Sequence, residues 1–486
     1  MGESSSITVD CSFPDIIVLG GARMNNDGSQ TGLRPGLLTL DRLRELVADG
    51  TVDTVEVSIT DMQGRLQGKR LSAEYFLDVV VPHETEACSY LLAVDVEMNT
   101  VAGYELSSWE SGYGDFVLKP DLGTLRMIPW QPGTAGVLAD VYWESGEPVT
   151  ASPRQLLRRQ LDRLAEHGLV AYAGTELEFI VFNDSFEQAW DRNYAGLTSA
   201  NQYNVDYSML GTARIEPLLR AIRNGMTGAG MFVESAKGEC NPGQHEIAFR
   251  YAQAMTTCDN HSIYKTGAKN IAAQQGSSLT FMAKYDEREG NSCHIHLSLR
   301  AAGDDAAVLA GEGEHGFSKL MEHYLAGQLA HVRELTLLYA PNINSYKRYA
   351  DGSFAPTTVA WGRDNRTCSL RVVGHGHGLR VENRVPGGDV NPYLAVAGMI
   401  AAGLDGIERE LPLEPEFRGN AYDAADRPRV PKTLRDAAEL FAESALAKSA
   451  FGEGVVAHYL NAARIEVEAF DATVTDWERR RGFERL

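Results

Sequence analysis

The sequence has few of the features that mark several protein classes. Its six cysteines are scattered over 486 residues with no Cys-x-x-Cys pair, so neither a zinc knuckle nor a disulfide framework is indicated. No basic-then-apolar segment opens the chain, and the longest apolar run, within residues 394–404, is interrupted by alanine and glycine and too short to cross a bilayer. These absences predict a cytoplasmic protein with reduced thiols and no membrane partner.

Positive charge is also scarce. The chain has 45 lysines and arginines against 66 aspartates and glutamates, which gives a net charge of −21 at pH 7. A surface of this sign repels nucleic acid, and an acidic cleft within it would favour cationic ligands or bound metals. We therefore expect no nucleic-acid partner, although plain solubility accounts for the same charge.

The chain predicts an α+β fold with two domains behind an N-terminal extension. Residues 1–35 are irregular, residues 36–145 form a helix-and-sheet pattern that ends in a Pro/Gly-rich linker, and residues 146–486 alternate strands and helices without a repeat. A helix is predicted to begin at Pro153, with Ser152 as its N-cap.

Two acids stand in an otherwise apolar strand pattern at residues 173–182. Successive side chains of a strand point to opposite faces, so Glu176 and Glu178 share one face. Like charges held close on a buried element repel each other, and a buried carboxylate without compensation is costly. A divalent cation would compensate both carboxylates.

Three further segments offer partners for these acids. They contribute Glu239 and Glu246 around a Pro-Gly turn, His294, His296 and Ser298 on one strand face, and Arg380, Glu382 and Arg384 on another. Each pattern alone is more often a solvated face or a satisfied core histidine. Together they offer five carboxylates and an imidazole, a hard set of ligands that suits Mg²⁺ or Mn²⁺ and is poor for structural zinc.

Arginines form the second group of evidence. Six of them stand between residues 344 and 384, and a guanidinium group binds carboxylate or phosphate through two parallel hydrogen bonds. Any one of them fits a surface charge equally well, but several lie in strand patterns beside the acids. Acids that hold metals next to arginines are the parts of a phosphoryl-transfer site, although the chain has no Walker A sequence and no kinase Gly-rich loop.

These segments resemble the glutamine synthetase superfamily, type I-like, over nearly all of residues 37–486. The shared patterns are Glu-x-Glu, Pro-Gly-Gln-x-Glu, His-x-His-x-Ser, Asn-x-x-Ser-Tyr-Lys-Arg, Asn-Arg-x-x-x-x-Arg, Arg-x-Glu-x-Arg and Asn-Pro-Tyr-Leu, in the family's order. The resemblance implies a small N-terminal β-grasp-like domain and a large catalytic domain with a curved antiparallel sheet. It also implies a ring-shaped homo-oligomer, such as a dodecamer, with active sites between subunits.

The resemblance also implies roles by position. Glu178, Glu239 and Glu246 match the ligands of one metal, and Glu176, His294 and Glu382 those of a second. Gly290, Arg348 and Arg384 match the residues that bind glutamate; His296, Ser298, Arg371 and Arg380 match contacts of ATP. Arg366 and Arg371 match the arginines that face the phosphate, and Arg348, Arg366 and Asp95 match residues that act in catalysis. In this family ATP phosphorylates the γ-carboxylate of glutamate, and an amine then displaces phosphate to form an amide.

The chain departs from the ammonia-using members of the family near the place that would meet ammonium. Phe354 stands where those proteins have a flap glutamate, Glu97 and Met98 follow Asp95 in place of small residues, and Glu289 replaces an asparagine. A long alkylamine needs an apolar channel for its methylenes and carboxylates for its ammonium ends. These residues therefore predict a γ-glutamylpolyamine synthetase that acts on putrescine, cadaverine, spermidine or spermine, with Asp95 as general base.

Other functions stay open. A ligase for ethanolamine or another monoamine differs from a polyamine ligase only in the need for the extra acids, and an ordinary glutamine synthetase with altered loops is a further alternative. A noncatalytic relative is disfavoured because all six metal-ligand positions are filled, and a His-x-His hydrolase because its barrel places that motif on the first strand. Tyr422, near the place where some relatives are adenylylated, is interpreted as a surface tyrosine.

Overall fold

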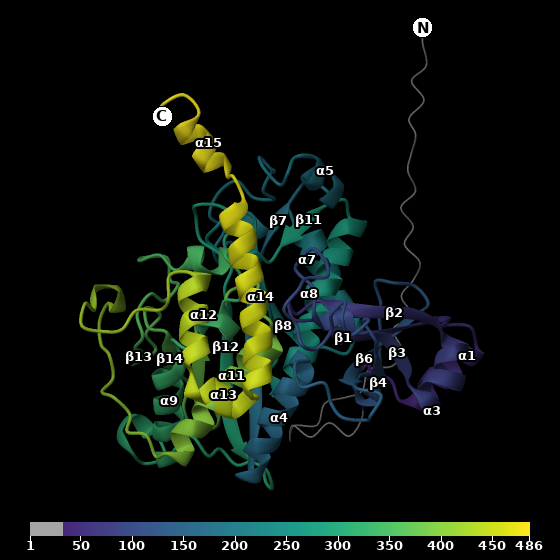
Figure 1. The fold of residues 1–486 in the computed structure, drawn as a ribbon, viewed down its shortest axis with the longest axis horizontal. Helices are drawn as coiled ribbons and strands as arrows, with labels where there is room; N and C mark the ends of the chain where they lie inside the picture. The colour runs from purple at the N-terminus through teal and green to yellow at the C-terminus, as the bar shows by residue number, and fades with distance from the viewer. Residues whose placement is uncertain (1–32) are drawn as a thin grey trace. The chain divides into compact units, whose positions relative to one another are not determined.

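The computed structural model describes residues 33–486, so nearly all of the predicted extension lies outside the described residues. Residues 35–486 form one unit (Figure 1). Whether that unit divides near residue 145, as the sequence predicts, stays a prediction. Among the described residues, none of the helices is both long and apolar enough to span a membrane.

The N-terminal part contains a six-stranded sheet, seen in purple and blue in Figure 1. Its strands are β1 (Thr54–Thr60), β2 (Leu66–Ser72), β3 (Thr85–Cys88), β4 (Asp115–Pro120), β5 (Arg126–Met127) and β6 (Thr134–Tyr142), in the order β2-β1-β6-β4-β3 with β5 on β6. The helix α1 (Leu40–Ala48) precedes them, and the short helices α2 (Ala73–Tyr75) and α3 (Val81–His83) lie between β2 and β3. Val55, Val57 and Ile59 alternate into the apolar core of this sheet, as their spacing predicts.

The second sheet carries the site. Its strands are β7 (Leu169–Phe182), β8 (Val233–Gly238), β9 (Gln244–Phe249), β10 (Ala252–Gln253), β11 (Ser278–Thr280), β12 (Cys293–Ala301), β13 (Trp361–Arg363), β14 (Leu370–Val373) and β15 (Arg380–Asn383). The order is β13-β14-β15-β12-β7-β9-β8, with β10 and β11 also on β7. Every pair is antiparallel except β13 with β14. The α+β fold with a large antiparallel sheet is therefore confirmed.

The remaining helices lie before, between and after these strands. The longer ones are α4 (Pro153–Glu166), α7 (Glu216–Gly228), α8 (Ala254–Gln274), α9 (Lys319–His331), α11 (Pro392–Glu408), α12 (Leu434–Glu443) and α14 (Glu453–Ala472), and the shorter ones are α5 (Phe186–Asp191), α6 (Met209–Thr212), α10 (Thr336–Tyr339), α13 (Ala445–Phe451) and α15 (Asp476–Gly482). Of these, α4, α7 and α8 contact the sheet. The helix α4 begins at Pro153 as predicted, but the Ser152 side chain makes no capping hydrogen bond.

The apolar run at residues 394–404 is the buried helix α11, which packs against α9. Its glycines permit the close approach: a Cβ added at Gly403 would lie 2.1 Å from the Tyr324 ring, and one at Gly406 would lie 2.1 Å from the His323 carbonyl oxygen. A core helix therefore explains this segment.

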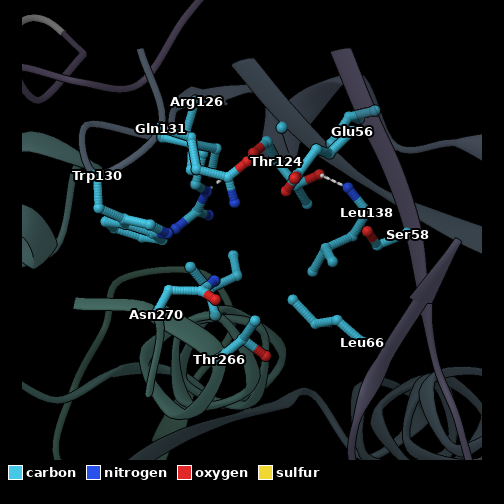
Figure 2. A pocket seen from close by; sticks show the side chains of 14 residues that line it. Glu56, Ser58, Leu66, Thr124, Arg126, Trp130, Gln131, Leu138, Thr266 and Asn270 are labelled. Carbon is cyan, nitrogen blue, oxygen red and sulfur yellow. Dashed lines mark hydrogen bonds between the residues drawn. The ribbon is translucent and has the colours of Figure 1, made fainter. Parts of the chain in front are cut away.

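The N-terminal sheet meets α8 at a seam that contains a small pocket, lined from one side by β1 and β2 and from the other by α8 (Figure 2). Arg126 lies at this seam, where its Nε donates to the Thr124 carbonyl (3.0 Å) and its Nη1 to Asn260 Oδ1 on α8 (2.8 Å). Trp130 from the N-terminal part joins the apolar core of the larger sheet. These contacts attach the N-terminal sheet to the part of the chain that carries the second sheet.

Candidate active site

The strand register brings the predicted acids together on β7 and its two neighbours. His294 on β12 lies directly opposite Glu176, and Glu246 on β9 lies directly opposite Glu178. Residues that face each other across an antiparallel pair project to the same side of the sheet. Each predicted metal group therefore has a carboxylate on the same face of β7.

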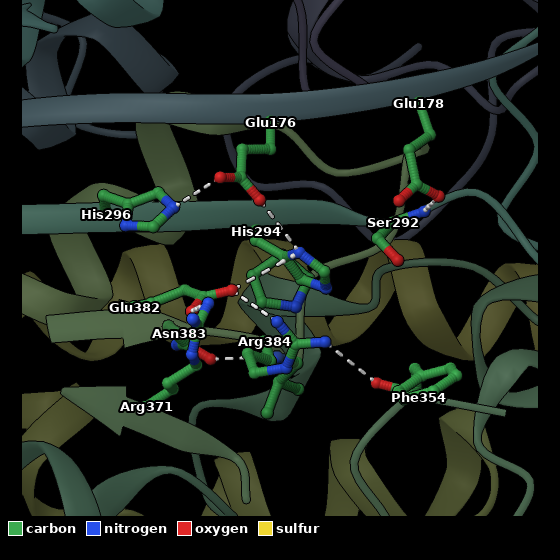
Figure 3. Close-up of polar contacts among 12 residues, drawn as sticks. Glu176, Glu178, Ser292, His294, His296, Phe354, Arg371, Glu382, Asn383 and Arg384 are labelled. Carbon is green, nitrogen blue, oxygen red and sulfur yellow. Dashed lines mark hydrogen bonds and ion pairs between the residues drawn. The ribbon is translucent and has the colours of Figure 1, made fainter. Parts of the chain in front are cut away.

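The same face continues onto β15 and β14. Glu382 on β15 lies opposite His296 on β12 and opposite Arg371 on β14. Figure 3 shows these side chains and Glu176 directed toward one another between the strands. One row of acids, imidazoles and arginines therefore crosses the sheet.

Glu178, Glu239 and Glu246 form the first group of carboxylates. Each offers one oxygen, and these oxygens all lie within 4.8 Å of one another. Burial, together with the charge of Glu239, raises the pKa of Glu178 to about 8, and burial and the neighbouring acids raise the pKa of Glu246 well above its ordinary value. Lys237 pairs with Glu239 and compensates only part of this charge. The group has the donors and the surplus negative charge that a hard divalent cation requires.

The second group contains one residue more than the sequence indicated. Oxygens of Glu176 and Glu382 and a ring nitrogen of His296 lie within 4.8 Å of one another. The predicted ligand His294 also faces this space, with its Nδ1 3.2 Å from Glu176 Oε2 and 3.5 Å from Glu382 Oε1 (Figure 3). Burial and the nearby Arg384 lower the pKa of His294 to about 4, which keeps the imidazole in the neutral form that binds metals.

The predicted glutamate-binding residues lie beside the acids. Arg348 is 2% exposed, and its Nη2 donates to the carbonyls of Arg384 (3.1 Å) and Pro386 (3.0 Å). A Cβ added at Gly290 would lie 3.0 Å from Arg348 Cγ and 2.1 Å from the Ala283 carbonyl oxygen, so only glycine permits this approach. The structure therefore brings Gly290, Arg348 and Arg384 to one place.

The remaining arginines differ in how they are held. Arg371 forms an ion pair with Glu382 at 2.9 Å and another with Asp364. Arg380 donates through Nε to His296 Nδ1 at 3.1 Å. The Arg366 side chain is exposed, and within residues 33–486 it makes no hydrogen bond or ion pair. Its guanidinium group is therefore available to a ligand.

Sequence reasoning missed an aromatic platform at the end of the row. Ser298 lies opposite Tyr172, and the next residue on that face of β12, Arg300, places its guanidinium carbon 4.5 Å from the centroid of the Tyr172 ring and 5.6 Å from that of Tyr251. The alternation of β12 was the signal that could have found Arg300. Tyr251 could not be found in this way, because it lies between β9 and β10 and its position depends on how these two strands pair with β7.

The structure does not join the members of the predicted amine pocket through polar contacts in the described residues, so this pocket stays a prediction. The Asp95 carboxylate accepts from the backbone N–H of Asn99 (2.8 Å), and the Met98 sulfur accepts from Arg65 (3.2 Å). In the described part of the chain, no hydrogen bond or ion pair links Asp95, Glu97 or Met98 to Phe354 or to the two acidic groups.

Two members of the predicted pocket do lie near the acids. The Phe354 carbonyl accepts from Arg384 Nη2 at 3.2 Å. The Glu289 carbonyl accepts from Asn241 Nδ2 at 2.7 Å, on the turn between Glu239 and Glu246, which places Glu289 beside the first acidic group.

Known proteins resemble this chain in sequence and in fold. A model of the glutamine synthetase catalytic domain family matches residues 150–482. A gamma-glutamylethanolamide synthetase of Streptomyces coelicolor is 66% identical over 449 residues, which cover 92% of this chain and 96% of that protein. A glutamate–isopropylamine ligase of a Pseudomonas species is 36% identical over 441 residues, with coverages of 90% and 96%. A solved GmaS/ADP complex matches with a TM-score of 0.80 and 27% identity and covers 91% of this chain and 99% of that one.

The predicted family and its amine-ligase branch are confirmed by these matches. The polyamine acceptor is not supported, since neither of the two ligases is named for a polyamine, and the alternative of ethanolamine or another monoamine fits better. The chain belongs to the glutamine synthetase family and is a glutamate–amine ligase of that family.

Proposed function

We propose that the protein joins the γ-carboxylate of glutamate to ethanolamine in an ATP-dependent reaction. The observation that carries this proposal is the 66% identity, over 92% of the chain, to a gamma-glutamylethanolamide synthetase. The flap position agrees with it, because Phe354 cannot take a proton from ammonium as a glutamate can. The members of this family generally use ATP and divalent metals.

The number of carboxylates near the site indicates whether the acceptor is a long polyamine or a short amine. A polyamine needs a carboxylate at the far end of its channel, whereas a short amino alcohol does not. Glu289 lies near the first acidic group, where its carbonyl accepts from Asn241 Nδ2 at 2.7 Å, and in the described residues no hydrogen bond or ion pair links a second acid of the predicted pocket to that group. A short amine is therefore the better fit.

The two acidic groups fit two Mg²⁺ or Mn²⁺ ions, since each combines several hard oxygen donors and the second adds neutral imidazole nitrogen. Bound there, such ions supply charge neutralisation for the phosphates of ATP. Glu178, Glu239 and Glu246 would hold the first, and Glu176, Glu382 and His294 the second.

The chain's own residues orient the first step. A γ-carboxylate oxygen of glutamate attacks the terminal phosphorus of ATP, ADP leaves, and γ-glutamyl phosphate forms. Arg348, Arg384 and Gly290 would bind the substrate glutamate. Arg366 and Arg371 would stabilise the negative charge on the transferred phosphoryl group. The guanidinium group of Arg366 makes no hydrogen bond or ion pair within residues 33–486, whereas that of Arg371 is oriented by its ion pairs with Glu382 and Asp364.

In the second step the amine nitrogen attacks the acyl carbon, phosphate leaves, and the amine gives up a proton. Phe354 cannot accept this proton. We assign the proton to Asp95 acting across an interface between subunits, because within residues 33–486 no hydrogen bond or ion pair joins its side chain to the two acidic groups. This assignment requires a ring-shaped homo-oligomer, for which a dodecamer is the family's precedent.

The aromatic platform would bind the nucleobase of ATP. Tyr172, Tyr251 and Arg300 lie at the Ser298 end of the row, on the face that carries the acids. Stacking of a base on an aromatic ring contributes about 1–3 kcal/mol. Replacing Tyr251 with alanine is therefore expected to raise the KM for ATP about tenfold or more and to change kcat little, whereas Tyr251→Phe should retain most of the affinity. Steady-state kinetics with saturating glutamate and amine measure both, and an unchanged KM in the alanine variant would refute the platform.

A panel of amines tests the acceptor. The protein is incubated with ATP, glutamate, Mg²⁺ and one amine at a time, and the glutamyl adducts are quantified by mass spectrometry together with released phosphate. We expect ethanolamine to give the highest kcat/KM, above isopropylamine, putrescine, spermidine and ammonia. Propylamine, which replaces the hydroxyl with a methyl group, serves as the matched control. If ammonia or a polyamine is the best acceptor, the proposed substrate is wrong.

A further inference from the structure

Tyr422 does not lie free on the surface. It stands in the short turn Ala421–Asp423 and is half-buried, and its hydroxyl donates to the Ala355 carbonyl at 3.1 Å. Burial raises the pKa of Tyr422, so the phenol remains a protonated donor. Tyr422 is thus a partly exposed tyrosine, as interpreted from the sequence, but its hydroxyl is engaged by the chain.

Ala355 belongs to residues 351–357, which we call the flap. The flap residue Phe354 has φ +59 and a side chain that is 58% exposed. This left-handed conformation is disfavoured for a bulky residue and persists where neighbouring contacts impose it. Its carbonyl accepts from Arg384 Nη2 at 3.2 Å, as Figure 3 shows, while the next carbonyl in the chain accepts from Tyr422. Two consecutive carbonyls are thus held by donors from different segments.

The stem of the flap is tied to the same segment as Tyr422. Arg429 donates through Nη1 to Thr357 Oγ1 (2.8 Å) and through Nη2 to the Tyr422 carbonyl (3.0 Å). Thr357 Oγ1 donates in turn to Asp351 Oδ1 (2.6 Å), and the backbone N–H of Val430 donates to the Thr357 carbonyl (3.1 Å). With the stem fixed in this way, the Tyr422 hydroxyl extends the attachment to the tip.

We propose that Tyr422 is a positioning residue that acts through Ala355 to hold the flap and its Phe354 ring over the acceptor side of the site. The inference rests on the proposed function, since it concerns the step in which an amine meets γ-glutamyl phosphate. An acyl phosphate is also attacked by water, so a flap that closes the site directs it to the amine. A loosened flap lets water take the acyl group, which yields glutamate and phosphate without amide.

Tyr422→Phe removes the hydroxyl and keeps the ring. With the amine that the wild-type protein uses best, ADP and glutamyl amide are quantified in the same reaction. We expect the wild-type protein to form about one amide per ADP, and the variant to form several-fold fewer amides per ADP, with a several-fold higher KM for the amine and an unchanged KM for ATP. A merely structural loss would lower kcat without changing the ratio of amide to ADP.

Tyr459→Phe is the matched control, because the Tyr459 hydroxyl also donates to a backbone carbonyl, that of Ala151 at 2.8 Å, and is more deeply buried. It should keep the wild-type ratio. An unchanged ratio and amine KM in Tyr422→Phe, or an equal fall in both variants, overturns the role of Tyr422 while the ligase activity stands. A wild-type protein that forms no glutamyl amide with any amine overturns the proposed function and this inference together.

Discussion

Replacing Glu178 with glutamine is expected to lower both glutamyl-amide synthesis and glutamate-dependent ATP hydrolysis by about 10²–10³-fold or more, the loss seen when a group that organises transition-state charge is removed. Glu178 lies between Glu239 and Glu246, and its Oε2 accepts from the Ser292 N–H at 2.7 Å and from Gln244 at 3.0 Å. A glutamine keeps the accepting oxygen toward these donors. The amide group then takes the place of the oxygen that faces the other acids.

The same variant distinguishes a metal-binding role of the first acidic group from a purely structural role. Burial and the charge of Glu239 raise the pKa of Glu178 to about 8, so the metal-free chain must take up a proton at this carboxyl when it folds at neutral pH, which lowers its stability. We expect the thermal midpoint of metal-free Glu178→Gln to equal or exceed that of the wild-type protein. Mg²⁺ or Mn²⁺ should raise the midpoint of the wild-type protein and leave that of the variant unchanged.

Glu234→Gln provides the control, since Glu234 is exposed on β8 and belongs to neither acidic group. It should behave as the wild-type protein in both measurements. Full activity in Glu178→Gln, or an undiminished stabilisation by Mn²⁺, would refute the first metal group.

Replacing Arg154 with methionine is expected to produce the largest loss of stability. Arg154, at the start of α4, is 3% exposed and binds three aspartates. Its Nη1 donates to Asp140 (2.6 Å), its Nη2 to Asp121 (2.6 Å) and its Nε to Asp259 on α8 (3.0 Å). Removing one member of a buried ionic network costs about 3–5 kcal/mol, because the other members remain buried without their partner.

Differential scanning fluorimetry of Arg154→Met should therefore show a thermal midpoint several degrees below that of the wild-type protein. Arg154→Lys, which keeps the charge but not the three-way geometry, should fall between them. Arg44→Ala breaks only an exposed ion pair with Asp41 and should leave the midpoint unchanged. Asp140 lies on β6 of the N-terminal sheet, and Asp121 directly follows β4. An unaltered midpoint in Arg154→Met would therefore show that this network does not stabilise the contact of the N-terminal sheet with α4 and α8.

Much of the candidate site follows from local sequence patterns. Glu176 and Glu178 are two apart on a strand, as are His294 and His296, and each pair shares a face whichever partner the strand has. The glycine at 290, in contrast, is explained by two tertiary contacts, with the Ala283 carbonyl oxygen and with the side chain of Arg348.

The predictions that changed concern contacts between distant segments. His296 joins the second acidic group because β15 pairs with β12 and sets Glu382 opposite it. The Asp95 carboxylate accepts from Asn99 in its own loop, and no hydrogen bond or ion pair in the described residues joins it to the other acids of the predicted amine pocket. Tyr422 reaches Ala355, which is 67 residues away, across a turn whose course no local pattern indicates.

The sequence by itself determined the strand and helix periods, the face that carries each acid, and the family to which those motifs belong. The tertiary structure decided which faces meet, that the two acidic groups form one row, and that the flap is held from two sides. The reason is physical: the direction of a side chain is set by the backbone of its own segment, whereas strand register and loop contacts are set by long-range pairing of segments.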